Sequence, residues 1–145
     1  MEIYSIGFTQ KSASEFFGIL KAHGIQRLLD VRLNNTSQLA GFAKQADLAY
    51  FLHEICGAAY EHEPLLAPTQ DILDTYKKQK GSWELYEREF LALMRSRRIE
   101  TRIDKEGFAL KTVLLCSEPT AEHCHRRLVL EYLREHWGGV TISHL

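Results

Sequence analysis

The sequence predicts an α/β domain, a three-layer sandwich with a mainly parallel sheet of about five strands. Three observations support this prediction. Short apolar, β-prone runs alternate with amphipathic helical segments along the whole chain. The length of 145 residues, with 45% hydrophobic residues, suits one domain with a sizeable core. No internal repeat, linker or low-complexity segment interrupts the pattern, so we expect a single domain over residues 1–145.

The first quarter of the chain predicts a β-α-β unit. Residues 3–8 form a short, apolar, β-prone run. A capping box at residues 12–15 then precedes the apolar spacing of a helix, which Gly24 ends. A second strand is expected over residues 28–31, followed by a polar turn at residues 33–37.

The middle of the chain predicts mostly helices. Asp47 can cap a helix whose apolar residues repeat at helical spacing until Gly57. A weak third strand is expected near residues 58–61. Residues 69–99 then predict two helical pieces, separated at Gly81 and Ser82.

The last third predicts a strand, a helix and a final strand. Residues 109–116 end in the apolar run Val-Leu-Leu-Cys, which is typical of a strand buried on both faces. Pro119 and Thr120 are expected to open a helix that Gly138 and Gly139 end. Residues 140–142 predict the closing strand.

Polar residues follow several of the predicted strands. Thr9 follows the first strand, Asp30 and Arg32 follow the second, and Cys116 and Glu118 follow the buried apolar run. Residues two apart on a strand point the same way, so each of the last two pairs can project together. Ligands of open parallel sheets bind at the carboxyl ends of the strands. We therefore expect these side chains to share one edge of the sheet.

The start of the last helix adds Cys124, His125 and Arg126 to that edge. His125 lies one turn before Val129, so it continues the apolar face of the helix. An imidazole and a guanidinium are costly in a dry core, but they suit a cleft near the positive end of the helix dipole.

Each candidate also has a structural interpretation. Asp30 and Arg32 form a stabilising ion pair in one interpretation, with about even odds. A single strand cysteine such as Cys116 is more often a small buried residue than a nucleophile. Cys116, Cys124 and His125 do not have the spacing of a zinc ribbon, although they could ligate a metal if the intervening loop folds back.

Two families of phosphate-binding motif are excluded. A phosphatase loop after Cys124 would need an arginine six residues later, and position 130 is Leu130. The chain also has neither a Gly-x-Gly-x-x-Gly run nor a Walker-type loop.

Five sequence blocks, in order and spacing, resemble the DUF488 family of bacterial and archaeal proteins, a domain of unknown function. The blocks are residues 4–7, 30–32, 114–118, 124–126 and 140–144, and Cys-x-Glu followed by Cys-His-Arg is the most specific part. The resemblance implies an α/β fold and a shared site. That site comprises Asp30, Arg32, Cys116, Glu118, Cys124, His125 and Arg126.

The chain departs from the family pattern in three places. Phe8 and Thr9 stand where relatives usually have His and Ser. Residues 34–37 replace the Pro and Ser that tend to follow the Asp-Val-Arg block, and residues 65–68 replace an expected Leu-Gly-Gly. These changes affect the substrate pocket, whereas the Cys-Glu and Cys-His-Arg blocks are intact.

Composition limits the classes of partner. Lys plus Arg total 18 and Asp plus Glu total 19, so the net charge of -1 does not indicate a general affinity for nucleic acid or membranes. The chain has three cysteines, an odd and sparse set that does not suit the disulfide framework of a small secreted domain, so a reducing cytoplasm is favoured. The apolar runs are too short for a membrane span.

The leading hypothesis is a small cytoplasmic enzyme acting on an anionic or phosphate-bearing small molecule, such as a nucleotide or nucleic-acid component. Arg32 and Arg126 would hold the anion. Glu118, Asp30 or His125 would act as general acid or base.

The sequence is also compatible with a nucleophilic cysteine and with two other functions. Cys116 or Cys124 would be a nucleophile if cationic surroundings lower its pKa, and the sequence does not indicate which cofactor, if any, takes part. A second hypothesis is a non-catalytic nucleic-acid-binding module. It rests on a cluster of basic residues, namely Arg95, Arg97, Arg98, Arg102, Arg126 and Arg127. A third is a thiol-redox or metal site at Cys116 and Cys124.

Overall fold

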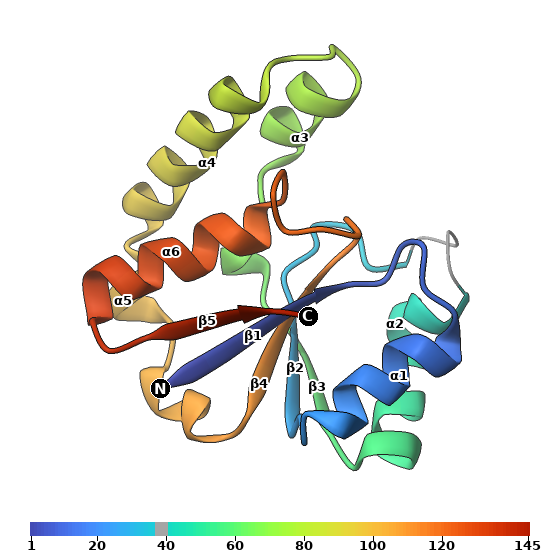
Figure 1. Cartoon of the computed structure of the whole chain (residues 1–145). Coiled ribbons are helices and arrows are strands. Elements are labelled where there is room, and N and C mark those ends of the chain that lie inside the picture. The colour runs from blue at the N-terminus through green and yellow to red at the C-terminus, as the bar shows by residue number, and fades with distance from the viewer. Residues whose placement is uncertain (37–40) are drawn as a thin grey trace.

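The computed structural model describes residues 1–36 and 41–145. Its centre is a five-stranded sheet in the order β3-β2-β4-β1-β5, in which every neighbouring pair is parallel (Figure 1). The strands are β1 (Glu2–Gly7), β2 (Arg27–Asp30), β3 (Ala59–His62), β4 (Thr112–Cys116) and β5 (Thr141–His144). The α/β prediction is therefore confirmed, and the sheet is parallel throughout.

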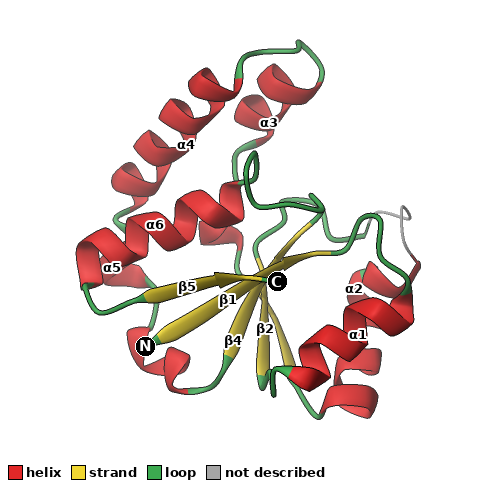
Figure 2. Cartoon of the chain, viewed as in Figure 1, coloured by secondary structure: helices red, strands yellow, loops and turns green. Residues whose placement is uncertain are grey.

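Helices cover both faces of the sheet, as Figure 2 shows. The α-helices are α1 (Ala13–Ala22), α2 (Gln45–Phe51), α3 (Gln70–Lys77), α4 (Trp83–Arg97), α5 (Ile99–Arg102) and α6 (His125–Trp137). Short helices of other types are η1 (Gly41–Ala43), η2 (Leu52–Cys56), η3 (Pro64–Leu66) and η4 (Lys105–Ala109). No helix among the described residues has the length and apolar character needed to span a bilayer.

Two apolar cores lie on opposite faces of the sheet. One packs α1, α2 and η2 against Ile6, Leu28 and Leu115. The other packs α4, α5 and α6 against the opposite side chains, such as Leu29 and Leu114. Alternate residues of one strand therefore enter different cores, which is the period of two that a pleated strand imposes. This arrangement gives the three layers of the sandwich.

Strand β4 is the middle strand, and all five of its residues are buried. Its apolar run predicted burial on both faces, and the structure confirms it. The chain leaves β1 and β2 toward helices on one face, and it leaves β3 and β4 toward helices on the other. The chain after β4 and the chain after its neighbours β1 and β2 therefore cross to opposite faces of the sheet. Such a topological switch point leaves a crevice at the carboxyl edge.

The structure corrects two predicted helix starts. Helix α6 begins at His125, whereas Pro119 and Thr120 lie in the preceding loop. Helix α2 begins at Gln45 after Lys44, so Asp47 lies inside the first turn rather than at the cap. Local capping signals are weak where tertiary contacts determine the path of the chain. The last residue of the turn expected at residues 33–37 lies outside the described residues.

Gly7 at the end of β1 is required by a close approach of the backbone. A β-carbon built at this position would lie 1.6 Å from the carbonyl oxygen of Glu118, in the loop that follows β4. Any side chain at position 7 would therefore displace that loop. The register pairs Gly7 with Cys116, so this contact lies at the carboxyl edge of the sheet.

We expect Gly7→Ala to lower the free energy of unfolding by at least about 2 kcal/mol, because overpacking a closed contact forces the backbone to shift. Gly18→Ala is the matched control, since nothing lies within 4 Å of its added β-carbon and alanine favours a helix. Urea unfolding of both variants measures the difference. Equal stabilities would show that the loop does not rest on Gly7.

Candidate functional site

A cavity of about 380 Å³ opens at the carboxyl edge of the sheet. The loop after β2, helices α3 and α4, the end of β4 and the start of α6 form its wall. The lining residues are Arg32, Leu33, Asn34, Pro68, Leu73, Tyr76, Lys77, Tyr86, Cys116, Ser117, Glu118, His123, Cys124 and His125. A larger hollow lies near Met1 and Lys111, away from this edge, and none of the predicted site residues lines it.

Cys116 and His125 form a pair in the cavity wall. The Cys116 sulfur lies 3.6 Å from Nδ1 of His125, and both residues are buried. Nε2 of the same ring lies 2.7 Å from the carbonyl oxygen of Val31. A carbonyl only accepts, so Nε2 carries the proton of the neutral ring and Nδ1 presents its lone pair to the sulfur.

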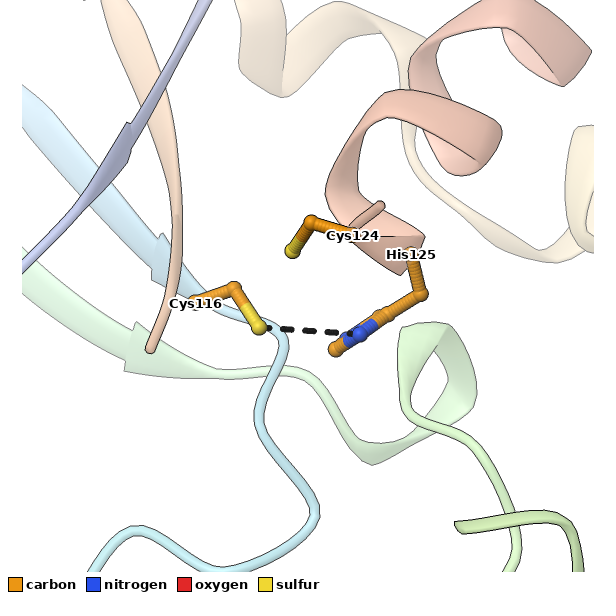
Figure 3. A group of neighbouring side chains, drawn as sticks. All are labelled: Cys116, Cys124 and His125. Atoms are coloured by element: carbon orange, nitrogen blue, oxygen red, sulfur yellow. Dashed lines mark hydrogen bonds between the residues drawn. The ribbon is translucent and has the colours of Figure 1, made fainter. Parts of the chain in front are cut away.

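Cys124 completes a cluster of three donor atoms. The two sulfurs and a ring nitrogen of His125 all lie within 4.8 Å of one another. Figure 3 shows the three side chains converging, Cys116 from the end of β4 and the other two from the start of α6. All three cysteines of the chain are free thiols, and Cys56 lies elsewhere on η2. The loop between β4 and α6 thus folds back, as a metal site would require.

The two clustered thiols have opposite pKa shifts. A hydrogen bond from Cys124 lowers the pKa of the Cys116 thiol, and burial opposes this effect. The charge of Arg126 and the backbone N–H groups of Ser117 and Glu118 add to the lowering. Burial raises the pKa of Cys124, and its bond to Cys116 raises it further. Cys116 is therefore the more acidic thiol of the pair.

Glu118 and Lys77 lie at the rim of the cavity. The Lys77 ammonium donates a hydrogen bond of 2.6 Å to the Glu118 carboxylate, and the two side chains are 50% and 37% exposed. Burial lowers the pKa of Lys77, but the bond and charge of Glu118 outweigh it and raise the pKa overall. An exposed pair of this kind contributes little to stability.

Asp30 and Arg32 form a buried ion pair below the cavity. Nε and an Nη of Arg32 each donate to the Asp30 carboxylate at 2.9 Å, and the guanidinium also donates to the Ala43 carbonyl. The Tyr60 hydroxyl donates to Asp30 at 2.6 Å. Burial, followed by this bond, raises the pKa of Tyr60, which therefore stays a donor. Arg32 reaches the cavity wall, whereas Asp30 is fully buried and does not line it.

Arg126 holds the loop after β4 rather than lining the cavity. Its fully buried guanidinium donates to the Glu118 carbonyl at 2.7 Å and to the Ser5 hydroxyl at 3.1 Å. The Ser5 hydroxyl also shares a hydrogen bond of 2.5 Å with Nδ1 of His144. The final strand thus reaches the same edge, as the position of His144 in the register with Ser5 requires.

Thr9 supports the same loop from the end of β1. Its backbone N–H donates to the Ser117 carbonyl at 3.1 Å, and its hydroxyl bonds to the same oxygen. Thr9 does not line the cavity, so its contact is with the backbone that shapes the site.

The structure therefore brings five of the eight predicted site residues into the cavity wall. These are Arg32, Cys116, Glu118, Cys124 and His125. The other three, Thr9, Asp30 and Arg126, support the wall from behind.

Several wall residues were not predicted from the sequence. Lys77 and Tyr76 come from α3 and Tyr86 comes from α4, and all three were assigned to helices without a site role. Their helical spacing indicates only a packing stripe. Behind the wall, His62 of β3 contacts the Arg32 carbonyl through Nε2 at 2.8 Å.

We expect Asp30→Asn to destabilise the fold by about 3–5 kcal/mol, because it leaves the buried Arg32 guanidinium without its counter-charge. Asp74→Asn, which weakens the solvent-exposed pair with Lys78, is the matched control and should cost at most about 1 kcal/mol. Denaturant titration measures both. Similar values for the two variants would contradict a structural role for the buried pair.

His144 makes stability depend on pH. Burial of the ring, followed by the charge of Arg126, lowers the pKa of His144 from the ordinary value of 6.5. The unfolded chain therefore takes up the proton at a higher pH than the folded chain, so this stabilisation is present above pH 6.5. It is lost as the pH falls toward the lower folded pKa.

We expect His144→Asn to remove this part of the pH dependence. Urea unfolding at pH 7.5 and 5.5 should show a smaller loss of stability at the acid pH in the variant than in the wild type. The exposed His53→Asn variant is the control and should behave as the wild type. An unchanged pH dependence in His144→Asn would contradict the assignment.

One family model matches the chain, the domain of unknown function DUF488, over residues 12–133. The match includes β2, β4 and the start of α6, and with them the residues of the cavity wall. Neither the curated proteins nor the solved structures contain a match to the chain. Since the matched segment covers most of the sequence, the chain belongs to the DUF488 family.

Proposed function

We propose that the protein is an enzyme that binds a small anionic or phosphate-bearing molecule in the cavity and acts on it beside Cys116 and His125. The observation that carries this proposal is the composition of the cavity wall. A thiol–imidazole pair, a carboxylate and an ammonium group line one hollow at the carboxyl edge of a parallel sheet. This is the place where α/β domains bind their ligands.

The size of the cavity favours a small molecule. A volume of about 380 Å³ lies toward the lower end of the range for ligand pockets, roughly 300–1,000 Å³. The rings of Tyr76 and Tyr86 form part of the wall, with ring centroids 4.8 Å apart. Aromatic walls suit a flat ring, so a nucleotide or a nucleic-acid component fits this shape.

Positive groups on the wall support an anionic ligand. The Lys77 ammonium lies at the rim, where solvent reaches it. Arg32 also lines the cavity, although its buried guanidinium is paired with Asp30. Helix α6 directs its N-terminus toward the same cavity, and the Cys124 side chain does not cap it. The first N–H groups of a helix favour a negative charge.

Glu118 is the group that we assign as general acid or base. It is the only carboxylate that lines the cavity among residues 1–36 and 41–145. Both oxygens of Asp30, by contrast, accept bonds from Arg32 and Tyr60 below the wall. We therefore assign Asp30, Arg126 and Thr9 to positioning the wall, and His125 to the reacting centre.

The nucleic-acid-binding alternative has less support. Arg97 donates to the carbonyls of Leu65 and Ala67, Arg127 pairs with Glu131, and Arg126 is fully buried. These guanidinium groups are bonded to acceptors within the protein, so they do not form a free basic surface for nucleic acid. Arg95, Arg98 and Arg102 are exposed, which fits a solvated face. We also propose a cytoplasmic location, because three free thiols suit a reducing compartment.

Binding of phosphate-bearing compounds tests the proposal. We expect inorganic phosphate or one of the nucleoside 5′-monophosphates to raise the melting temperature of the wild type. Lys77→Met should weaken that binding about 10- to 100-fold, because a hydrogen bond to a charged group is lost. Glu122→Gln, in the loop that carries Glu118, is the control and should bind as the wild type. Absence of any shift, or equal binding by the two variants, would overturn the assignment of the cavity.

Turnover of a compound that binds tests the role of Glu118. We expect Glu118→Gln to retain binding and to lower kcat about 100-fold or more, which is the usual contribution of a general acid or base. Glu122→Gln should keep the wild-type rate. A Glu118→Gln variant that turns over normally would show that this carboxylate does not transfer the proton.

A further inference from the structure

We propose that Cys116, Cys124 and His125 bind a zinc ion, with one coordination position left open toward the cavity. Two thiolates and one imidazole are a ligand set that Zn²⁺ prefers. The three donors come from the end of β4 and the start of α6, so two packed elements fix their spacing (Figure 3).

The distances within the cluster suit a single ion. Tetrahedral zinc with bonds of about 2.3 Å to sulfur and about 2.0 Å to nitrogen separates these two ligand atoms by roughly 3.5 Å. The Cys116 sulfur and His125 Nδ1 are 3.6 Å apart. All three donor atoms lie within 4.8 Å of one another, so small rotations of the side chains bring them around one centre.

The surroundings prepare His125 as a ligand. Its Nε2 bonds to the Val31 carbonyl at 2.7 Å, which fixes the ring and leaves the Nδ1 lone pair facing the sulfurs. Histidines that bind metals usually donate their other N–H to a carbonyl or carboxylate in this way. Val31 is itself held by a backbone bond to Leu115 of β4, so the carbonyl belongs to the sheet edge.

Charge balance also favours a dication. Cys116, Cys124 and His125 are 6%, 2% and 6% exposed. Two thiolates in such a place need a counter-charge, because isolated buried charges are costly. Zn²⁺ neutralises both thiolates, and the resulting group carries no net charge.

The open position gives the ion a catalytic role, and this part of the inference rests on the proposed function. Structural zinc sites are closed by four protein ligands, whereas catalytic sites keep three and leave the fourth position to water. Here the described residues supply three, and the same cavity contains the Glu118 carboxylate. A water at the open position would transfer one proton to Glu118 as its oxygen forms a bond to the phosphorus of a phosphate ester. The bond from phosphorus to the leaving oxygen breaks and Glu118 returns the proton to that oxygen, so the reaction class is hydrolysis.

Zinc binding to the purified protein tests the site without any substrate. After dialysis against a chelator, we expect the wild type to take up one Zn²⁺ per chain with a dissociation constant below about 1 μM in competition with a chromophoric chelator. Cys124→Ser and His125→Gln should each weaken binding about 100-fold or more. Cys56→Ser and His53→Gln, which change a cysteine and an exposed histidine away from the cavity, should bind as the wild type.

Two measurements on the wild type keep the test valid if a ligand variant fails to fold. Bound Zn²⁺ should protect Cys116 and Cys124 from alkylation but leave Cys56 reactive. Bound Co²⁺ should give the sulfur-to-metal absorption and intense visible bands of a tetrahedral thiolate site. Absence of stoichiometric binding, or protection of all three cysteines alike, would overturn the proposal.

The outcomes separate this inference from the proposed function. Stoichiometric zinc on the three residues, with no binding of any phosphate compound, would support the metal site and reject the proposed ligand. Binding of a phosphate compound by a protein that has no affinity for Zn²⁺ would support the proposed ligand and reject the metal site.

Discussion

The site depends on how the loop between β4 and α6 is held against the end of β1. The buried Arg126 guanidinium bonds to the Glu118 carbonyl and to Ser5, and Thr9 bonds to the Ser117 carbonyl. Gly7 leaves the space in which this loop passes. These contacts fold residues 117–124 back, and they bring the start of α6 to the end of the central strand. Without these contacts, nothing would hold Cys124 close to Cys116.

Buried and exposed charges have different roles at this edge. Asp30 with Arg32, and Arg126 with its oxygen acceptors, are removed from water and hydrogen-bonded. Breaking such buried interactions costs several kcal/mol of folding free energy, so they fix the geometry of the wall. Lys77 and Glu118 are paired in solvent, where an ion pair is weak and a ligand can replace either partner. We therefore propose that the chemistry takes place at the rim and at the thiol–imidazole cluster, which the buried pairs hold in position.

Much of this organisation is predictable from the sequence. The buried strand that ends at Cys116 follows from the four consecutive apolar residues Val-Leu-Leu-Cys, and the position of Cys116 and Glu118 at the carboxyl edge follows from the parallel order of the strands. The predicted helix start at Pro119 is wrong, because the loop has to fold back before α6 can begin. Local capping signals contain no information about that tertiary contact.

Other features could not be predicted because they depend on packing between distant segments. Lys77 is one of many charged helical residues, and only the placement of α3 over the cavity distinguishes it. Tyr60 and His62 lie on a short edge strand with a weak sequence signal, yet they bond to Asp30 and to the Arg32 carbonyl. The bonds of Arg126 to Ser5 and Glu118 likewise join residues that sequence spacing does not relate.

A crystal structure of the protein purified without chelator, with diffraction recorded on both sides of the zinc absorption edge, tests the central claim most directly. We expect one anomalous peak at bonding distance from the sulfurs of Cys116 and Cys124 and from Nδ1 of His125, with the Arg126 guanidinium bonded to the loop. A map without that peak, with Cys124 and His125 turned away from the end of β4, would contradict it.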